Sequence, residues 1–306
     1  MTFIKFGFRS LFRQKRRTSI TLLVIVFGIG SLLLATGHSR FIGWGLREST
    51  IHADTGHLQV FHRQYFEQDE ETILEYGLED YERMRADFIG LPEVREVLAR
   101  IELMGLLSNG EKSVACIGQG VEPEKEAKMR ALGGLSSVMY DPFLSQSDAE
   151  IIALGNGLAD SLNVNQGDYV TLMTTTAEGA LNALDLRVVG TFSGFSPEYD
   201  ARAIVLPLKT AQMLLNTSKV KNLVVTLEGT AKTDMLFDEI SRLSEENGYP
   251  VVLRKWHEQA FYYKKVRQFY KQLTGFLSLA LFILVFFSTS NTIVMAILER
   301  TREIGT

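Results

Sequence analysis

The amino-acid sequence predicts a membrane protein with two transmembrane α-helices and a large α+β extracytoplasmic domain between them. Three observations support this expectation. Two long runs contain no charged residue, at 18–37 and 273–298. The segment between them, 38–272, holds 34 acidic and 24 basic residues. The residues before the first run are basic without any acid. Such segregation of apolar and charged residues along a chain is typical of membrane proteins.

Each uncharged run is long enough to cross a bilayer. The run at 18–37 has 20 residues, which as a helix span about 30 Å, the thickness of a bilayer's hydrocarbon core. A buried core helix is the alternative interpretation, although such a helix rarely stays uncharged on every face. The first run is too long for a signal peptide, and the small-residue cleavage pattern is absent. We therefore expect it to remain in the mature protein.

The residues before the first run indicate the orientation. Residues 1–17 carry six basic side chains and no acidic one, so the positive-inside rule places this end in the cytoplasm. Their apolar and basic residues favour an amphipathic helix on the membrane surface. A basic tail that merely extends the first span is the alternative. The side chains expected at the membrane surface are Lys5, Arg9, Arg13, Arg16 and Arg17.

Residues 38–255 predict the extracytoplasmic domain. A β-α-β-β pattern, with its helix at 70–88, leads to two strands joined by Asn109-Gly110, a strong hairpin signal. A β-rich insert is expected at about 121–216, with a short helix at 151–162, and a β-α-β pattern follows at 221–253. Cys116 is the only cysteine, so no internal disulfide forms and we expect it in the core.

The second apolar run continues a polar helix. Residues 256–272 predict a stalk helix that runs into the span at 273–298, because no proline or glycine intervenes before Gly275. Asn291 lies within this span. An amide in a transmembrane helix usually bonds to a neighbouring helix, so Asn291 is expected to support helix packing. A water-exposed position near the inner interface is the alternative.

The sequence offers no catalytic site. It contains no GxxxxGK[ST] loop, and its glycine pairs lack the third glycine of a dinucleotide fingerprint. His57 and His62 are five residues apart on an expected strand, so they face opposite sides. No nucleophile motif organises the serines and histidines. We therefore expect no catalytic residue, metal or cofactor in this chain, and no nucleic-acid partner.

A short charged segment follows the second span at once. Its charges are Glu299, Arg300, Arg302 and Glu303, and opposite charges three residues apart support a helical turn. On composition alone, a docking segment and a solvated helix end are equally good interpretations. The run NTIVMAILERTREIGT, 291–306, closely resembles the segment that ends the second transmembrane helix in FtsX-like permeases, which belong to ABC transporters of the MacB and lipoprotein-releasing type.

Three other stretches carry the same resemblance. LFRQKRRTSITLLVIVFGI, 11–29, resembles the first span of that family, and both IGQGVEPEKE, 117–126, and LGNGLADSLNVNQGDYVTL, 154–172, resemble its exported core domain. The resemblance implies that 299–306 begins a cytoplasmic coupling helix, with Glu299, Arg300, Arg302, Glu303 and Gly305 docking on a separate ATPase subunit. That subunit would bind ATP and Mg²⁺. Four transmembrane helices are expected in the family, so the chain is expected to be truncated within the motif.

The function implied is that of a non-catalytic permease subunit in the bacterial inner membrane. It would couple ATP hydrolysis to movement of the extracytoplasmic domain, for lipoprotein release or MacB-type efflux. Its expected partners are the ATPase, a second permease copy or sister permease, membrane lipid, and a lipoprotein or periplasmic protein. One alternative is an FtsX-type mechanotransmitter that regulates a cell-wall hydrolase. Another is a two-span extracytoplasmic sensor, which the charged segment disfavours.

Overall fold

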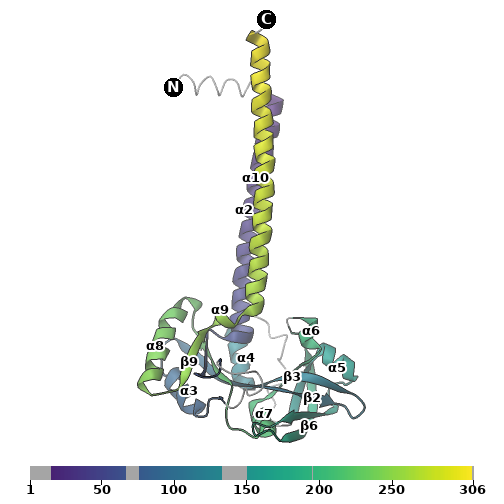
Figure 1. Ribbon diagram of the computed structural model, residues 1–306, viewed down its shortest axis with the longest axis vertical. Helices are drawn as coiled ribbons and strands as arrows, with labels where there is room; N and C mark the ends of the chain where they lie inside the picture. The colour runs from purple at the N-terminus through teal and green to yellow at the C-terminus, as the bar shows by residue number, and fades with distance from the viewer. Residues whose placement is uncertain (1–14, 67–75, 133–149, 195, 305–306) are drawn as a thin grey trace. The chain divides into compact units, whose positions relative to one another are not determined.

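The computed structural model describes residues 15–66, 76–132, 150–194 and 196–304. These residues fall into two compact units (Figure 1). One unit contains the described residues up to Arg47 and those from Tyr262 onward, and the other spans Glu48–Phe261. The first is a pair of long helices and the second an α+β domain. The predicted fold class is therefore confirmed.

The first unit is built from α2, Lys15–Thr50, and α10, Phe261–Ile304. Two stretches are long and apolar enough to cross a membrane, Ser19–Thr55 and Phe261–Met295. Helix α2 is longer than the uncharged run, since it begins at Lys15 and continues past two glycines beyond the run's end, Gly43 and Gly45. A glycine weakens a helix by only about 1 kcal/mol. Within a bilayer the backbone has no other way to satisfy its hydrogen bonds, so the helix persists.

The expectation of one unbroken helix from Trp256 is wrong. Trp256–Gln259 forms a separate short helix, α9, and α10 begins only at Phe261. Between them Ala260 leaves the helical conformation, with φ −77° and ψ 69°. The break falls at an alanine rather than at a glycine or proline, and the first amide of α9, that of Trp256, donates to the carbonyl of His57 at 3.0 Å. The amphipathic helix expected at 1–17 lies mostly outside the described residues.

The domain is organised by one long strand, β2, Val94–Ser108. Its first half pairs with β8, Asn222–Leu227, in an antiparallel sheet of order β2-β8-β1-β9. The other two strands are β1, Leu58–His62, and β9, Val251–Lys255. Helices α3, Tyr81–Ile89, and α8, Thr233–Glu246, pack on β2 and β9 respectively (Figure 1). The helix expected at 70–88 is partly wrong: residues 76–80 are not helical, with Leu78 in an isolated bridge to Val220, while 70–75 lie outside the described residues.

The second half of β2 enters a closed ring of six strands. The ring order is β3-β7-β4-β6-β5-β2, and β2 pairs back onto β3. The bounds are β3, Ser113–Val121; β4, Ile151–Gly155; β5, Tyr169–Thr175; β6, Leu181–Phe192; and β7, Ala203–Pro207. The insert expected at 121–216 is therefore not a separate module. Its strands need partners for their edges, and β2 and β3 supply them.

Four short helices follow strands of the ring: α4, Pro123–Leu132; α5, Asn156–Leu162; α6, Pro197–Asp200; and α7, Leu208–Leu215. The 3₁₀ turn η3, Thr230–Lys232, instead joins β8 to α8. The helix expected at 151–162 is half wrong, because its first five residues form β4. All five are buried, so this apolar segment becomes a strand that faces protein on both sides. Helix α4 occupies part of a stretch that sequence patterns left irregular, and 133–149 lies outside the described residues.

Two local predictions are confirmed. Strands β2 and β3 form a hairpin, with Ser108 opposite Ser113. Gly110 has φ 90° at the turn, and the Asn109 side chain accepts hydrogen bonds from the amides of Glu111 and Lys112 at 2.9 and 2.7 Å. Cys116 is buried in the main hydrophobic core, among the inward-facing residues of the ring. That core extends from the barrel into the four-stranded sheet.

Candidate functional site

The two long helices are joined by a hydrogen bond between threonines. Thr21 Oγ1 of α2 lies 3.0 Å from Thr292 Oγ1 of α10. The Thr292 hydroxyl also donates to the carbonyl of Ser288 at 2.9 Å. Because that bond uses its only proton, Thr21 is the donor across the pair. Near this bond, Gly28 faces Val285 and Leu281, and a Cβ at Gly28 would lie 3.6 Å from Val285.

The predicted site residues differ in what the structure describes of them. Asn291 is exposed on α10, while the interhelical bond is made by the next residue, Thr292. The helical backbone runs through Glu299, Arg300, Arg302 and Glu303 to Ile304. The positions of their side chains lie outside the described structure, as does Gly305. Of the expected membrane-surface residues, Arg16 is exposed and Arg17 is helical, whereas Lys5, Arg9 and Arg13 precede the described part.

Helix α2 continues directly into a turn of π-helix, η1, Ile51–Thr55, which belongs to the domain. Gly56 ends η1 with φ 62°, a conformation that suits glycine. A Cβ at this position would meet Val224 Cγ1 at 2.3 Å. The Gly56 amide bonds the carbonyl of Ile51 at 2.8 Å, and Gln59 Nε2 bonds that of Thr55 at 2.9 Å. The root of the first helix is thus held in one conformation.

His57 is the point where this root meets the rest of the domain. Its side chain is 1% exposed. Its Nδ1 accepts the amide of Leu227 at 3.1 Å, and its Nε2 lies 3.3 Å from the Thr230 hydroxyl. An Nδ1 that accepts cannot carry a proton, so the neutral ring holds its proton on Nε2. The His57 carbonyl takes the Trp256 amide. One residue therefore ties η1, β8, η3 and α9 together.

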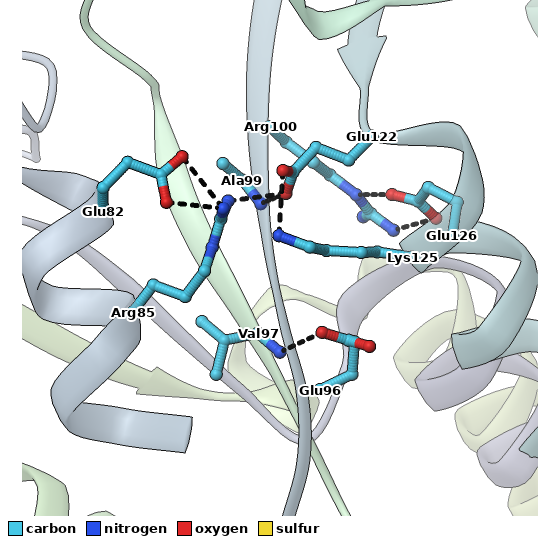
Figure 2. Close-up of polar contacts among 9 residues, drawn as sticks. All are labelled: Glu82, Arg85, Glu96, Val97, Ala99, Arg100, Glu122, Lys125 and Glu126. Carbon is cyan, nitrogen blue, oxygen red and sulfur yellow. Dashed lines mark hydrogen bonds and ion pairs between the residues drawn. The ribbon is translucent and has the colours of Figure 1, made fainter. Parts of the chain in front are cut away.

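A buried ion pair between β2 and α4 also contacts η1. Figure 2 shows this pair. Arg100 of β2 grips Glu126 of α4 with two hydrogen bonds, Nε to Oε1 at 2.6 Å and Nη2 to Oε2 at 2.9 Å. The side chains of this pair are 4% and 2% exposed. The third nitrogen of the guanidinium, Nη1, donates to the carbonyl of Asp54 in η1. We name Arg100 and Glu126 the root clamp.

A second carboxylate near the root clamp hydrogen-bonds the backbone at the edge of β2 (Figure 2). Glu122, between β3 and α4, accepts the Ala99 amide at 2.8 Å. It also accepts Arg85 Nη2 of α3 at 2.6 Å and Lys125 Nζ of α4 at 3.0 Å. Ala99 pairs with β8 on its other side, so Glu122 takes the place of a neighbouring strand. An exposed strand edge is thereby closed, and α3, β2 and α4 are linked.

The polar groups around η1 connect elements of the domain: η1 to β2, α4, β8, η3 and α9. Within the described residues, no group of three or more His, Cys, Asp or Glu side chains is placed to hold a metal ion. Burial raises the pKa of Cys116 to about 12, which suppresses the thiolate that nucleophilic chemistry needs. The candidate site is accordingly the set of residues within the domain that surrounds η1.

A comparison with known families identifies the domain. The model of one family, the MacB-like periplasmic core domain, matches residues 18–243. This match covers more than half of the chain. The chain belongs to the MacB-like periplasmic core domain family. It is an ABC transporter permease of the MacB and FtsX type, as the resemblance of its sequence indicated. It is therefore a membrane protein with an extracytoplasmic domain, of a family that works with an ABC ATPase.

Three solved structures are similar to parts of this chain. The extracellular domain of the noncanonic ABC-type transporter YknZ from Gram-positive bacteria is 11% identical, with a TM-score of 0.46 over 65% of this chain and 99% of that one. The periplasmic region of MacB from Actinobacillus actinomycetemcomitans is 13% identical, with a TM-score of 0.45 over 68% and 92%. A domain of a putative permease from Porphyromonas gingivalis is 15% identical, with a TM-score of 0.40 over 66% and 88%.

Sequence patterns missed the root clamp and the threonine pair. The signal for Arg100 was an arginine that follows three apolar residues and precedes Ile101 within the strand, which a buried partner would explain. Its partner Glu126 lies 26 residues away, on an element that was not anticipated. For the threonines, the signal was a hydroxyl in each uncharged run. No pattern within one helix could state that Thr21 and Thr292 meet.

Proposed function

We propose that this permease converts ATP hydrolysis by a separate ATPase subunit into movement of its extracytoplasmic domain. The observation that supports this most directly is the length of α10. Its 44 residues run from the domain boundary to the charged segment without interruption, a length of about 66 Å. A bilayer core needs only about 20 helical residues. One continuous helix therefore joins the end that carries Glu299 and Arg300 to the end that adjoins the domain.

In this proposal the charged segment receives the force. Glu299, Arg300, Arg302, Glu303 and Gly305 dock on the ATPase in the cytoplasm, and the N-terminus of the chain is on the same side. Each membrane helix is connected to an element of the domain: α2 leads into η1, and α9 leads into α10. The protein sits in the bacterial inner membrane as a multi-pass permease beside a second copy or a sister permease. Lys5, Arg9 and Arg13 rest on the anionic membrane surface.

For the substrate, we propose a lipoprotein released from the outer leaflet, with MacB-type efflux as the other member of the same class. Release of this kind does not require the substrate to pass through the domain. The buried polar groups of the domain tie its elements together, as expected of a part that transmits force. Neither substrate requires a catalytic residue in this chain.

The experiment is ATP-driven release from proteoliposomes that contain the full-length permease and the ATPase that co-purifies with it. The substrate probe is a fluorescent triacylated lipopeptide. The variant Glu299→Ala/Arg300→Ala/Arg302→Ala is expected to insert normally and hydrolyse ATP, yet lose release. Normal release by this variant would overturn the docking assignment. No release by the unmodified permease, together with ATP-dependent activation of a co-purified cell-wall hydrolase, would instead establish the mechanotransmitter.

A further inference from the structure

Arg100 occupies the residue at which β2 changes partners. Residues 94–100 of β2 pair with β8 in the four-stranded sheet, and Arg100 lies opposite Asn222 at the end of that pairing. The next residue, Ile101, is the first to pair with β3 in the barrel, opposite Gly120. A movement applied at Arg100 therefore acts on the sheet and the barrel at their shared boundary.

The guanidinium at this boundary reaches two further elements. Nη1 bonds the carbonyl of Asp54 in η1, the direct continuation of α2. The fork of Nε and Nη2 holds Glu126 of α4, which follows β3 after one residue, Glu122. Arg100 thus connects the root of the first membrane helix to two strands of the barrel, one directly and one through α4. Of the other ties of η1, His57 leads to the four-stranded sheet, where its amide bonds the carbonyl of Val225, and His52 leads to α4 through a hydrogen bond with the backbone of Met129.

Stability alone does not explain a buried ion pair at this position. Removing two charges from water is costly, and well-packed apolar residues of similar volume commonly stabilise a fold as well or better. What apolar side chains cannot do is fix an orientation, since their contacts are non-directional. A bidentate arginine and carboxylate pair fixes both distance and angle. The clamp therefore supplies geometry that packing would leave free.

We propose that Arg100 is a positioning residue for force transmission: it passes displacement of the first membrane helix, through η1, to the barrel. This inference rests on the proposed coupling function and extends it. The first helix acts on the barrel through the root clamp, while α10 acts through α9 and the sheet. The barrel moves relative to the sheet when the ATPase closes, and it stops responding when the clamp is replaced by apolar side chains of similar size.

The test measures barrel movement in the full permease with its co-purified ATPase in lipid nanodiscs. Spin labels are attached at Leu181→Cys on β6 and Met235→Cys on α8, which are 86% and 55% exposed. The native Cys116 is buried and its pKa is raised, so it stays unlabelled. Pulsed electron paramagnetic resonance then compares the label distance without nucleotide and with ATP and vanadate. The test variant is Arg100→Met/Glu126→Leu.

The matched control is Arg95→Met/Glu228→Leu. It removes an ion pair of 3.3 Å from the same strand, but one that is about half exposed and does not involve η1. We expect a nucleotide-dependent distance change in the parent and in this control, and none in Arg100→Met/Glu126→Leu. A retained change in that variant, or no change in the parent, overturns the proposal.

If Arg100→Met/Glu126→Leu fails to fold, the same label distances are measured in the single variant Glu126→Gln. It keeps one acceptor for the fork and is expected to reduce the change about twofold, whereas a full change overturns the clamp.

The coupling variant separates the two proposals. If Glu299→Ala/Arg300→Ala/Arg302→Ala abolishes the distance change while the clamp variant retains it, the coupling function stands and the role of Arg100 falls. If the coupling variant retains the full change, the proposed function itself falls. Thermal unfolding of each variant is measured alongside, because a merely structural clamp would lower the unfolding temperature without removing the response to ATP.

Discussion

The helix pair and the extracytoplasmic domain place their apolar side chains in opposite ways. On the helices, Phe27 and Leu34 are each 78% exposed and Phe282 is 67% exposed. In the domain, the large apolar residues form a continuous core, and the buried charges of Arg100 and Glu126 are paired. Apolar surface of the first kind suits hydrocarbon, and interior packing of the second kind suits water. The contrast shows that each part of the chain is built for its own solvent.

The sharpest test of the domain's interior is the reactivity of Cys116. Its pKa of about 12, against an ordinary value of 9.0, lowers the thiolate fraction at pH 8 by roughly a thousandfold. We expect iodoacetamide to label it very slowly in the folded permease, faster with rising pH, and rapidly in urea. The exposed variant Leu181→Cys is the matched control. Equal labelling of the two thiols in the folded protein would contradict a sealed barrel interior.

The buried charges of the domain are the next way to challenge the contrast. Glu126→Leu leaves Arg100 charged inside the protein without its partner, so we expect a loss of about 3–5 kcal/mol in the free energy of unfolding. The paired change Arg100→Met/Glu126→Leu should cost less, because the charge of Arg100 is removed as well, although Arg130, whose Nη2 lies 3.8 Å from Glu126, still loses that carboxylate. Urea unfolding followed by Cys116 labelling measures both. The interpretation is wrong if the single and paired variants unfold alike.

An aspartate placed on each apolar surface compares the two solvents directly. At Phe27 in α2 it would face hydrocarbon, with an expected cost of about 2.5–3.5 kcal/mol for membrane insertion. At Leu181, which is equally exposed but lies on the domain, it would face water and change stability by no more than about 0.5 kcal/mol. The fraction of each variant that resists carbonate extraction reports insertion. Normal insertion of Phe27→Asp would mean that α2 does not meet lipid at this point.

Features of the fold that depend on residues close together in the sequence were predictable, whereas features that depend on contacts between distant residues were not. The uncharged runs, the Asn109-Gly110 turn and the burial of Cys116 depend on neighbours along the chain, and the sequence alone was enough to predict them. The break at Ala260 ends a short helix, α9, whose first amide bonds the carbonyl of His57, about 200 residues earlier. No local pattern reports such a bond, so a single helix was expected there.

The barrel was missed for a related reason. The strands of the expected insert have clear local patterns, but ring closure is set by which edges pair. The pairing of β3 with β7 joins residues such as Gly118 and Ile204, and together with the pairing of β2 with β5 it shows that β2 and β3 belong to the ring. In the same way, the coupling role of Glu299 and Arg300 came from a resemblance, and it stays a prediction until their variants are measured.

The smallest expected effect tests how the helix pair is held together. Thr21→Val removes the donor to Thr292, whose hydroxyl still bonds the Ser288 carbonyl, so no polar group is left without a partner. Interhelical hydrogen bonds of this kind contribute about 0.6 kcal/mol. The cycle of Thr21→Val, Thr292→Val and the double variant isolates this term in thermal unfolding of the full chain. Asn291→Leu, in the same assay, tests the packing role predicted for that amide. A coupling of zero between the threonines would mean that packing against Gly28 and contact with lipid hold the helices together without the bond. The helix pair would then depend on its apolar surface alone, unlike the domain, whose buried charges must stay paired.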